Sequence, residues 1–193
     1  MSVVVGKVVS VHAGVGEDLG KEAQDSIQLE LDGVVGDRHR SFQRKTWEGD
    51  KQPEGTVRRN ERHWSAVSVE EIQHIEKEMD LAEPLSAASL GANLCLEGVP
   101  DLSRLTKGSL LKFSSGVELM VEEYNPPCLD MGKKLASLHS RKSGEALADT
   151  AFSQAAKFSR GVVGVIEVAG TINTGEEVTV ELYQPPKWLR NTD

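Results

Sequence analysis

Cys128 is the residue whose chemical type and position most favour a reactive role. It follows an alternating apolar stretch over residues 117–124 and the segment Asn125-Pro126-Pro127. Because proline fixes φ at about −65° and restricts the residue before it, we expect the sulfur on a stiff turn at a strand end. A thiolate is a nucleophile and a ligand for soft metals. The alternative is that Cys128 is a small buried hydrophobe, the common fate of a free cysteine.

The second cysteine, Cys95, lies in Asn93-Leu94-Cys95-Leu96, which alternates as a strand does, and we expect it in the core. Two cysteines are too few for a disulfide framework, and they lack the spacing of a zinc site. The histidines show no metal-ligand spacing either; those outside the cluster described next are His12, His63, His74 and His139. A reducing cytoplasm is the simplest setting for such a chain.

Gly36-Asp37-Arg38-His39-Arg40 forms a second cluster with chemical potential. Its guanidinium groups and imidazole could hold a phosphate or a heterocycle, and the alternative is a polar turn with solvated charges. The cluster opens a basic segment, since residues 38–62 contain eight Lys or Arg and four Asp or Glu in a chain of net charge −8. Charges are screened over about 8 Å, so distant acids would not cancel a local basic patch.

The segments that must position these residues are mostly short strands. Alternating or valine-rich stretches predict strands over residues 3–12, 27–31, 66–69, 92–96, 110–113, 117–124, 161–169 and 178–182. We expect a turn over 171–175 and one long basic loop over 38–63, which has no apolar period.

Two helices are predicted. The first begins at a capping box, Ser68 and Glu71, and carries apolar residues at helical spacing as far as Met79. The second covers residues 143–158, with Gly161 just past its end. It would bury Leu147, Ala151, Phe152, Ala155 and Phe158. Many strands and few helices predict a mainly β fold, a barrel or a strongly bent sheet, and argue against a parallel α/β fold.

The bulk composition predicts one globular domain over residues 1–185 and a tail over 186–193. The N-terminal residues show no signal-peptide pattern, and no window of 18 apolar residues predicts a membrane span. The net charge of −8 argues against nucleic acid or anionic membranes as partners. We therefore expect a cytoplasmic protein.

The order of these features resembles the MOSC domain, the unit found at the C-terminus of molybdenum cofactor sulfurases. Gly36-Asp37-Arg38-His39 is similar to its G-D-x-H motif, and Leu90-Gly91-Ala92-Asn93-Leu94 to its L-G-E-N-L motif, with Ala92 in place of the usual glutamate. Cys128 and the segment from Arg160 to Glu167 follow in the expected order, although Pro127 precedes the cysteine where many members carry Arg or Lys. The resemblance covers residues 3 to 183, as in a free-standing member.

The resemblance implies a closed β-barrel like the small domain of pyruvate kinase, with a few short helices. It also implies that Cys128 binds the metal of the molybdenum cofactor or carries a persulfide sulfur. Asn93 and Arg160 match positions that line the cofactor pocket, and Asp37 and His39 match its rim. Arg38, Arg40 and Arg160 are then expected to supply the positive setting that a thiolate and the anionic part of the cofactor require.

Some free-standing members of this family reduce N-hydroxylated bases or amines, and the resemblance therefore implies an oxidoreductase of that kind. Cys128 would be the metal ligand, and His39 would supply a proton, because histidine titrates near neutrality. The partners would be a small-molecule substrate and an electron-donor protein. Two alternatives remain open: a sulfur carrier with a persulfide on Cys128, and a non-catalytic module that holds the cofactor for another protein.

Overall fold

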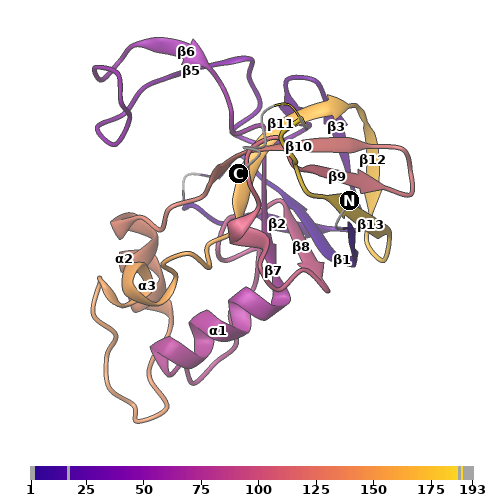
Figure 1. Ribbon diagram of the computed structural model, residues 1–193. Helices are drawn as coiled ribbons and strands as arrows, with labels where there is room; N and C mark the ends of the chain where they lie inside the picture. Colours follow the sequence, from indigo (N-terminus) through magenta and orange to yellow (C-terminus); the bar gives the residue numbers. More distant parts are fainter. Residues whose placement is uncertain (1–2, 17, 187, 189–193) are drawn as a thin grey trace.

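The computed structural model describes residues 3–16, 18–186 and 188, and its main feature is a closed β-barrel (Figure 1). The strands, in chain order, are β1 (Val3–Ala13), β2 (Glu22–Gln24), β3 (Ser26–Glu30), β4 (Gly33–Val34), β5 (Gln43–Lys45), β6 (Val57–Arg59), β7 (Trp64–Ser68), β8 (Leu94–Glu97), β9 (Leu110–Phe113), β10 (Glu118–Tyr124), β11 (Val162–Val168), β12 (Gly170–Asn173) and β13 (Glu177–Glu181). The helices are α1 (Val69–Met79), α2 (Leu129–Leu138), α3 (Ala151–Ala155) and a 3₁₀ turn, η1 (Leu102–Arg104).

Seven strands build the barrel in the order β13-β9-β10-β11-β7-β8-β1, and β1 pairs with β13 to close it. The closing pair is antiparallel and runs from Val3 opposite Glu181 to Lys7 opposite Glu177. Closure leaves the barrel without an open edge. The pairing of β7 with β8 is parallel, because α1 carries the chain back across the outside between them. The predicted mainly β fold with a closed barrel is therefore confirmed.

Two apolar cores support this architecture. One fills the barrel and contains Val8, Trp64 and Leu119 among its fully buried side chains. The other lies between the outside of the barrel and the helices, where Val67 and Cys95 meet Ile75 of α1 and residues of α2 and α3. Cys95 thus lies in the core as predicted, and burial raises the pKa of its thiol to about 11.

Helix α1 begins as the sequence predicts, but its capping box is half formed. The Ser68 hydroxyl accepts a hydrogen bond from the Glu71 N–H at 3.2 Å. The Glu71 carboxylate does not return to Ser68. It turns inward and accepts hydrogen bonds from the N–H and hydroxyl of Ser103, at 2.7 and 2.9 Å. Ser103 in turn accepts the N–H of Gly161 at 2.6 Å, so a buried carboxyl ties α1 to the start of β11.

The predicted helix over residues 143–158 is wrong. Only Ala151–Ala155 is helical there, and Phe158, expected to be buried, is 55% exposed. The sequence analysis missed helix α2 (Leu129–Leu138) because Gly132 interrupts its pattern. A side chain at Gly132 would lie 2.1 Å from the carbonyl oxygen of Asp149, so glycine is needed where the irregular segment packs against α2.

Two further expectations need correction. Residues 38–63 are not one loop, because β5 and β6 form an antiparallel hairpin with Gln43 opposite Arg59. Residues 171–175 are not all turn, because β12 pairs with β3 there in a small sheet that also contains β4. In Figure 1 the β5–β6 hairpin extends from one side of the barrel, and the helices lie on another.

Most of the predicted tail lies outside the described residues; within it, Trp188 is exposed. No described helix combines the length and the apolar composition that a membrane crossing requires.

The raised pKa of Glu71 predicts a specific pH dependence of the free energy of unfolding. Burial is the largest influence on this carboxyl and raises its pKa from 4.5 to about 7. Between those two values the folded protein keeps a proton that the unfolded chain has released. The free energy of unfolding should therefore fall as the pH rises through this interval, and that fall should be absent in Glu71→Gln. Urea unfolding at about pH 5 and about pH 8 measures it.

Glu78→Gln, at an exposed position of the same helix, should behave as the wild type. An unchanged pH dependence in Glu71→Gln would show that Glu71 does not titrate in this range.

Candidate functional site

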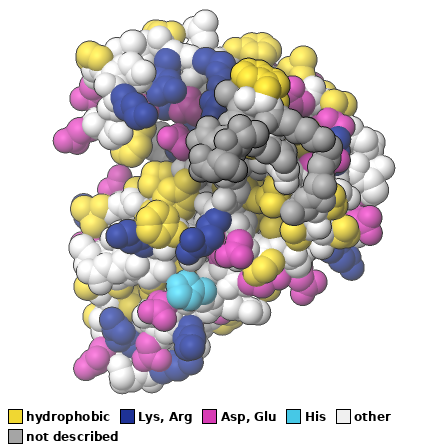
Figure 2. Space-filling view, viewed as in Figure 1, with side chains coloured by type: hydrophobic (Ala, Val, Ile, Leu, Met, Phe, Trp, Pro, Cys, Tyr) yellow, Lys and Arg dark blue, Asp and Glu magenta, His cyan; other side chains and the backbone are white. Residues whose placement is uncertain are grey.

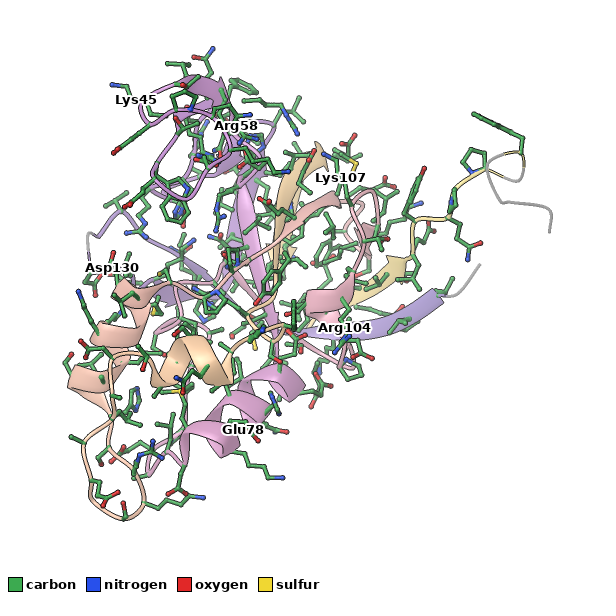
Figure 3. The ribbon with its side chains drawn as sticks, turned by 60° about the vertical axis from the view of Figure 1, so that its left-hand side comes forward. Lys45, Arg58, Glu78, Arg104, Lys107 and Asp130 are labelled. Carbon is green, nitrogen blue, oxygen red and sulfur yellow. The ribbon has the colours of Figure 1, made fainter. Side chains whose placement is uncertain are left out.

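A cavity of about 390 Å³ opens between the β5–β6 hairpin, one end of the barrel and the start of α2. Its lining includes the cationic residues Arg38, Arg44, Lys45, Arg62 and Arg160, whereas Asp130 is its one acidic lining residue in the described part of the chain. Figure 2 shows the surface hollowed between the hairpin and the helices, and in Figure 3 Lys45 and Asp130 lie on opposite sides of the opening. This composition suits an anionic ligand.

Cys128 lines this cavity from the place that the sequence analysis predicts, just after β10. It is half-buried and is the N-cap residue of α2, with an extended backbone at φ −106° and ψ 159°. Its side chain makes no capping hydrogen bond, so the sulfur remains available to a ligand. The N-terminal end of α2 adds partial positive charge at the same place.

Arg160 is the most unusual side chain of the cavity. It is 7% exposed, and its Nη2 donates a hydrogen bond to the carbonyl oxygen of Leu90 at 2.8 Å. Its Nε and Nη1 are buried without a hydrogen-bond partner among the described residues. Burial lowers the pKa of Arg160 to about 10, so the group stays charged at neutral pH. A buried cation with free donors costs free energy that a bound anion would offset.

The backbone around Arg160 is fixed from several sides. Gly161 has φ +82°, and a side chain there would lie 1.8 Å from the carbonyl oxygen of Ala66 in β7. The chain therefore passes close to the barrel immediately after Arg160, and the Gly161 N–H is held by Ser103. The guanidinium carbon of Arg160 lies 5.7 Å from the centre of the Phe152 ring of α3, a cation–π contact.

Arg62 is a second, partly buried cation of the cavity, and no role was predicted for it from the sequence. Its Nη2 donates to the side-chain oxygen of Asn125 at 2.6 Å, and burial lowers its pKa. Asn125 and Pro126, the lead-in to Cys128, also line the cavity. The contact between Arg62 and Asn125 therefore brings the end of the basic segment against the turn that carries the cysteine.

Arg38 and Arg40 were expected together in the site, and the structure separates them. Arg38 lines the cavity and donates to the carbonyl oxygen of Gly16 at 3.2 Å. Arg40 does not line it: its Nε lies 3.0 Å from both carboxylate oxygens of Asp32, and its Nη2 pairs with Glu30. Glu30 is the last residue of β3, and Asp32 lies in the turn between β3 and β4. Their ion pairs with Arg40 hold its side chain outside the cavity.

Two arginines of the expected basic patch are paired with acids of the same segment. Arg44 pairs with Asp50 at 2.6 Å and with Glu61 at 2.5 Å, and Arg58 reaches the same two carboxylates at 3.3 and 3.5 Å. Two of the four acids of the segment, Asp50 and Glu61, therefore lie within contact distance of its arginines. These pairs link the strands and the loop of the hairpin. The lining cations without an ion pair to a described residue are Arg38, Lys45, Arg62 and Arg160.

Asp37, His39 and Asn93 come together in one network, in which Asp37 and Asn93 are buried. The Asn93 side-chain N–H donates to Asp37 at 2.9 Å and to the carbonyl oxygen of His12 at 3.1 Å, and its oxygen accepts the Ser65 N–H at 3.1 Å. Asn93 thus joins β1 and β7, and its side chain shapes the cavity wall. His39 lines the cavity, whereas Asp37 lies behind it with its side chain fully buried.

Lys21 completes this network through its ion pair with Asp37. It was not predicted from the sequence, because a lone lysine among glycines and acids gives no motif.

No group of three or more His, Cys, Asp or Glu side chains in the described part of the chain is arranged to hold a metal ion. A metal bound here would need ligands that the described protein groups do not supply. A cofactor that carries its own metal ligands would provide them.

Comparison with known proteins finds a matching family model and a similar bacterial protein. The MOSC domain family model matches residues 37–179. YuaD of Bacillus subtilis (strain 168), whose name assigns it provisionally to metal–sulfur cluster biosynthesis, is 34% identical over 163 residues, which cover 83% of this chain and 82% of YuaD.

Comparison with solved structures finds proteins of the same fold. The crystal structure of YuaD from Bacillus subtilis superposes with a TM-score of 0.88 at 29% identity, over 95% of this chain and 99% of that one. YiiM from Geobacillus stearothermophilus superposes with a TM-score of 0.59 at 13% identity, over 93% of this chain and 75% of that one, a likeness of fold alone.

Proposed function

We propose that the chain, which belongs to the MOSC domain family, binds the molybdenum cofactor in the cavity between Cys128 and Arg160. The observation that carries this proposal is the buried Arg160 guanidinium with two free donors beside an unpaired cysteine. No acid among the described residues pairs with Arg160, so an anionic ligand is the natural partner of this site.

The residues present fit that cofactor. Its phosphate needs charge-assisted donors, which the free Nε and Nη1 of Arg160 supply, and Arg62 adds a second, partly buried cation. Its metal prefers a soft ligand, which the half-buried Cys128 supplies. The apolar wall formed by Leu90 and Met131 suits a planar ring system.

The activity that we propose is reduction of N-hydroxylated bases or amines. The bound cofactor would supply the redox chemistry, in which the substrate, two electrons and two protons give the amine and water. The chain itself holds the cofactor through Cys128 and Arg160, and the β5–β6 hairpin forms the opposite wall with Trp47. The electrons would come from a separate donor protein.

Sulfur transfer is the second candidate. A half-exposed thiol at a helix start could carry a persulfide, and the name of YuaD refers to metal–sulfur clusters. Here Cys128 would hold sulfur and no metal would stay bound. A third candidate is a module that holds the cofactor without turning over a substrate.

Cofactor retention is the first prediction. Protein made in a cell that produces the cofactor should retain molybdenum, Cys128→Ser should lose it, and Arg160→Ala should bind the cofactor about one to two decades more weakly. The last figure follows from about 1.5–3 kcal/mol for a charge-assisted hydrogen bond. Elemental analysis for molybdenum and a pterin assay measure both effects.

Two matched controls use residues that the structure places elsewhere. Arg40→Ala and Cys95→Ser should retain the metal, because Arg40 is paired outside the cavity and Cys95 is in the core. Equal metal content in Cys128→Ser and wild type would remove Cys128 as the ligand.

Turnover is the second prediction. Fully metallated protein given an artificial reductant should convert a hydroxylaminopurine to the aminopurine, and metal-free protein should not. Product is measured by chromatography. A metallated but inactive protein would favour the cofactor-holding module, and a persulfide on Cys128 without metal, detected by mass spectrometry, would favour sulfur transfer.

A further inference from the structure

A buried ion pair lies directly behind the cavity wall. The Nζ of Lys21 is 2.7 Å from the Oδ2 of Asp37, with the two side chains 2% and 0% exposed. Lys21 precedes β2 and is held by its N–H, which donates to the carbonyl oxygen of Ala88 at 3.1 Å. It lies outside the part of the chain matched by the family model, which begins at residue 37.

Asp37 connects this lysine to the cavity. Its Oδ1 accepts the backbone N–H of His39 at 3.0 Å and lies 3.1 Å from the Nδ1 of the same residue. Its Oδ2 accepts the Asn93 amide at 2.9 Å. A carboxylate surrounded by donors stays ionised, and these contacts hold the pKa of Asp37 well below its usual range despite its burial.

An ionised carboxylate can only accept hydrogen bonds. The Nδ1 of His39 must therefore carry the proton that it shares with Asp37. The second ring nitrogen, Nε2, is then the atom left for the cavity, which His39 lines with an imidazole that is 41% exposed.

We propose that Lys21 is a positioning residue of this pocket: by balancing the charge of Asp37, it keeps His39 a neutral imidazole whose Nε2 accepts a hydrogen bond from the bound ligand. Asp37 alone would favour the charged imidazolium, because an anion at hydrogen-bonding distance stabilises it. The Lys21 ammonium opposes that effect.

The electrostatics of the network agree with this geometry. Burial is the largest influence on His39 and lowers its pKa, Asp37 raises it, and Lys21 and Arg38 lower it further. Burial also lowers the pKa of Lys21 to about 8, with Arg38 and Arg160 acting in the same direction and Asp37 opposing. Lys21 therefore remains mostly charged at neutral pH, when His39 is neutral.

This inference deepens the proposed function and rests on it only for the identity of the ligand. A neutral Nε2 selects ligands that present an N–H or O–H group at this wall, such as a ring N–H or the hydroxyl of an N-hydroxylated substrate. His39 would then orient that group or take its proton, in place of the proton-donating role expected from the sequence.

Nuclear magnetic resonance of histidine-labelled full-length protein tests this directly. The ring nitrogen shifts of His39, assigned by their loss in His39→Gln, report its tautomer and charge across a pH titration. The wild type should be neutral at about pH 7 with the proton on Nδ1. Lys21→Met should raise the pKa of His39, and Lys21→Arg, which keeps the charge, should restore the wild-type titration.

Lys134→Met is the matched control. Lys134 is also partly buried near the cavity, where its Nζ donates to the carbonyl oxygen of Ser89 at 3.3 Å, but it does not contact Asp37 or His39. Its loss should leave the pKa of His39 unchanged. Should Lys21→Met fail to fold, Lys21→Gln, which removes the charge and keeps a polar side chain, makes the same comparison.

A His39 that is charged at neutral pH, that carries its proton on Nε2, or whose pKa responds equally to Lys134→Met and Lys21→Met would overturn the proposal. The resonances are recorded without cofactor, so a protein that holds no molybdenum would overturn the proposed function and leave this result standing. Conversely, a charged His39 in a protein that retains molybdenum would overturn this inference alone.

Discussion

The burial of the Arg160 guanidinium is the constraint on which the site depends. A charged group removed from water needs partners, and here the fold provides one carbonyl, that of Leu90, and one aromatic face, that of Phe152. Two of its nitrogens have no hydrogen-bond partner among the described residues, and the residue lines a cavity rich in cations. Such an arrangement lowers stability in the absence of a ligand and gives an anionic ligand a preorganised place to bind.

The barrel and the helices cooperate to keep the guanidinium there. Gly161 brings the chain against β7, and the Glu71–Ser103 contacts fix the same point from α1. Cys128 reaches the cavity from the segment between β10 and α2. Cys128 thus follows β10 and Arg160 precedes β11, and these two strands pair with one another.

Much of this could be predicted from local sequence patterns, and the rest depended on contacts distant in the chain. Alternating apolar residues located most barrel strands, and the proline pair before Cys128 located its turn. Helix α2 was not predicted because a glycine usually interrupts a helix. Here Gly132 lets the helix pack closely against the backbone of Asp149. Arg40 was assigned to the site because its neighbours in sequence belong there, and no local pattern shows that Glu30 and Asp32 draw it away.

The stability of the cofactor-free protein with Arg160→Met tests the central claim most directly. If the guanidinium is buried for a ligand, an apolar side chain of similar length should leave the free energy of unfolding within about 1 kcal/mol of the wild type, or raise it, because the cost of burying the charge disappears. Urea unfolding of both proteins without cofactor gives this difference. A loss of about 3 kcal/mol or more, as when one partner of a completed buried ion pair is removed, would contradict the account and make Arg160 a structural residue.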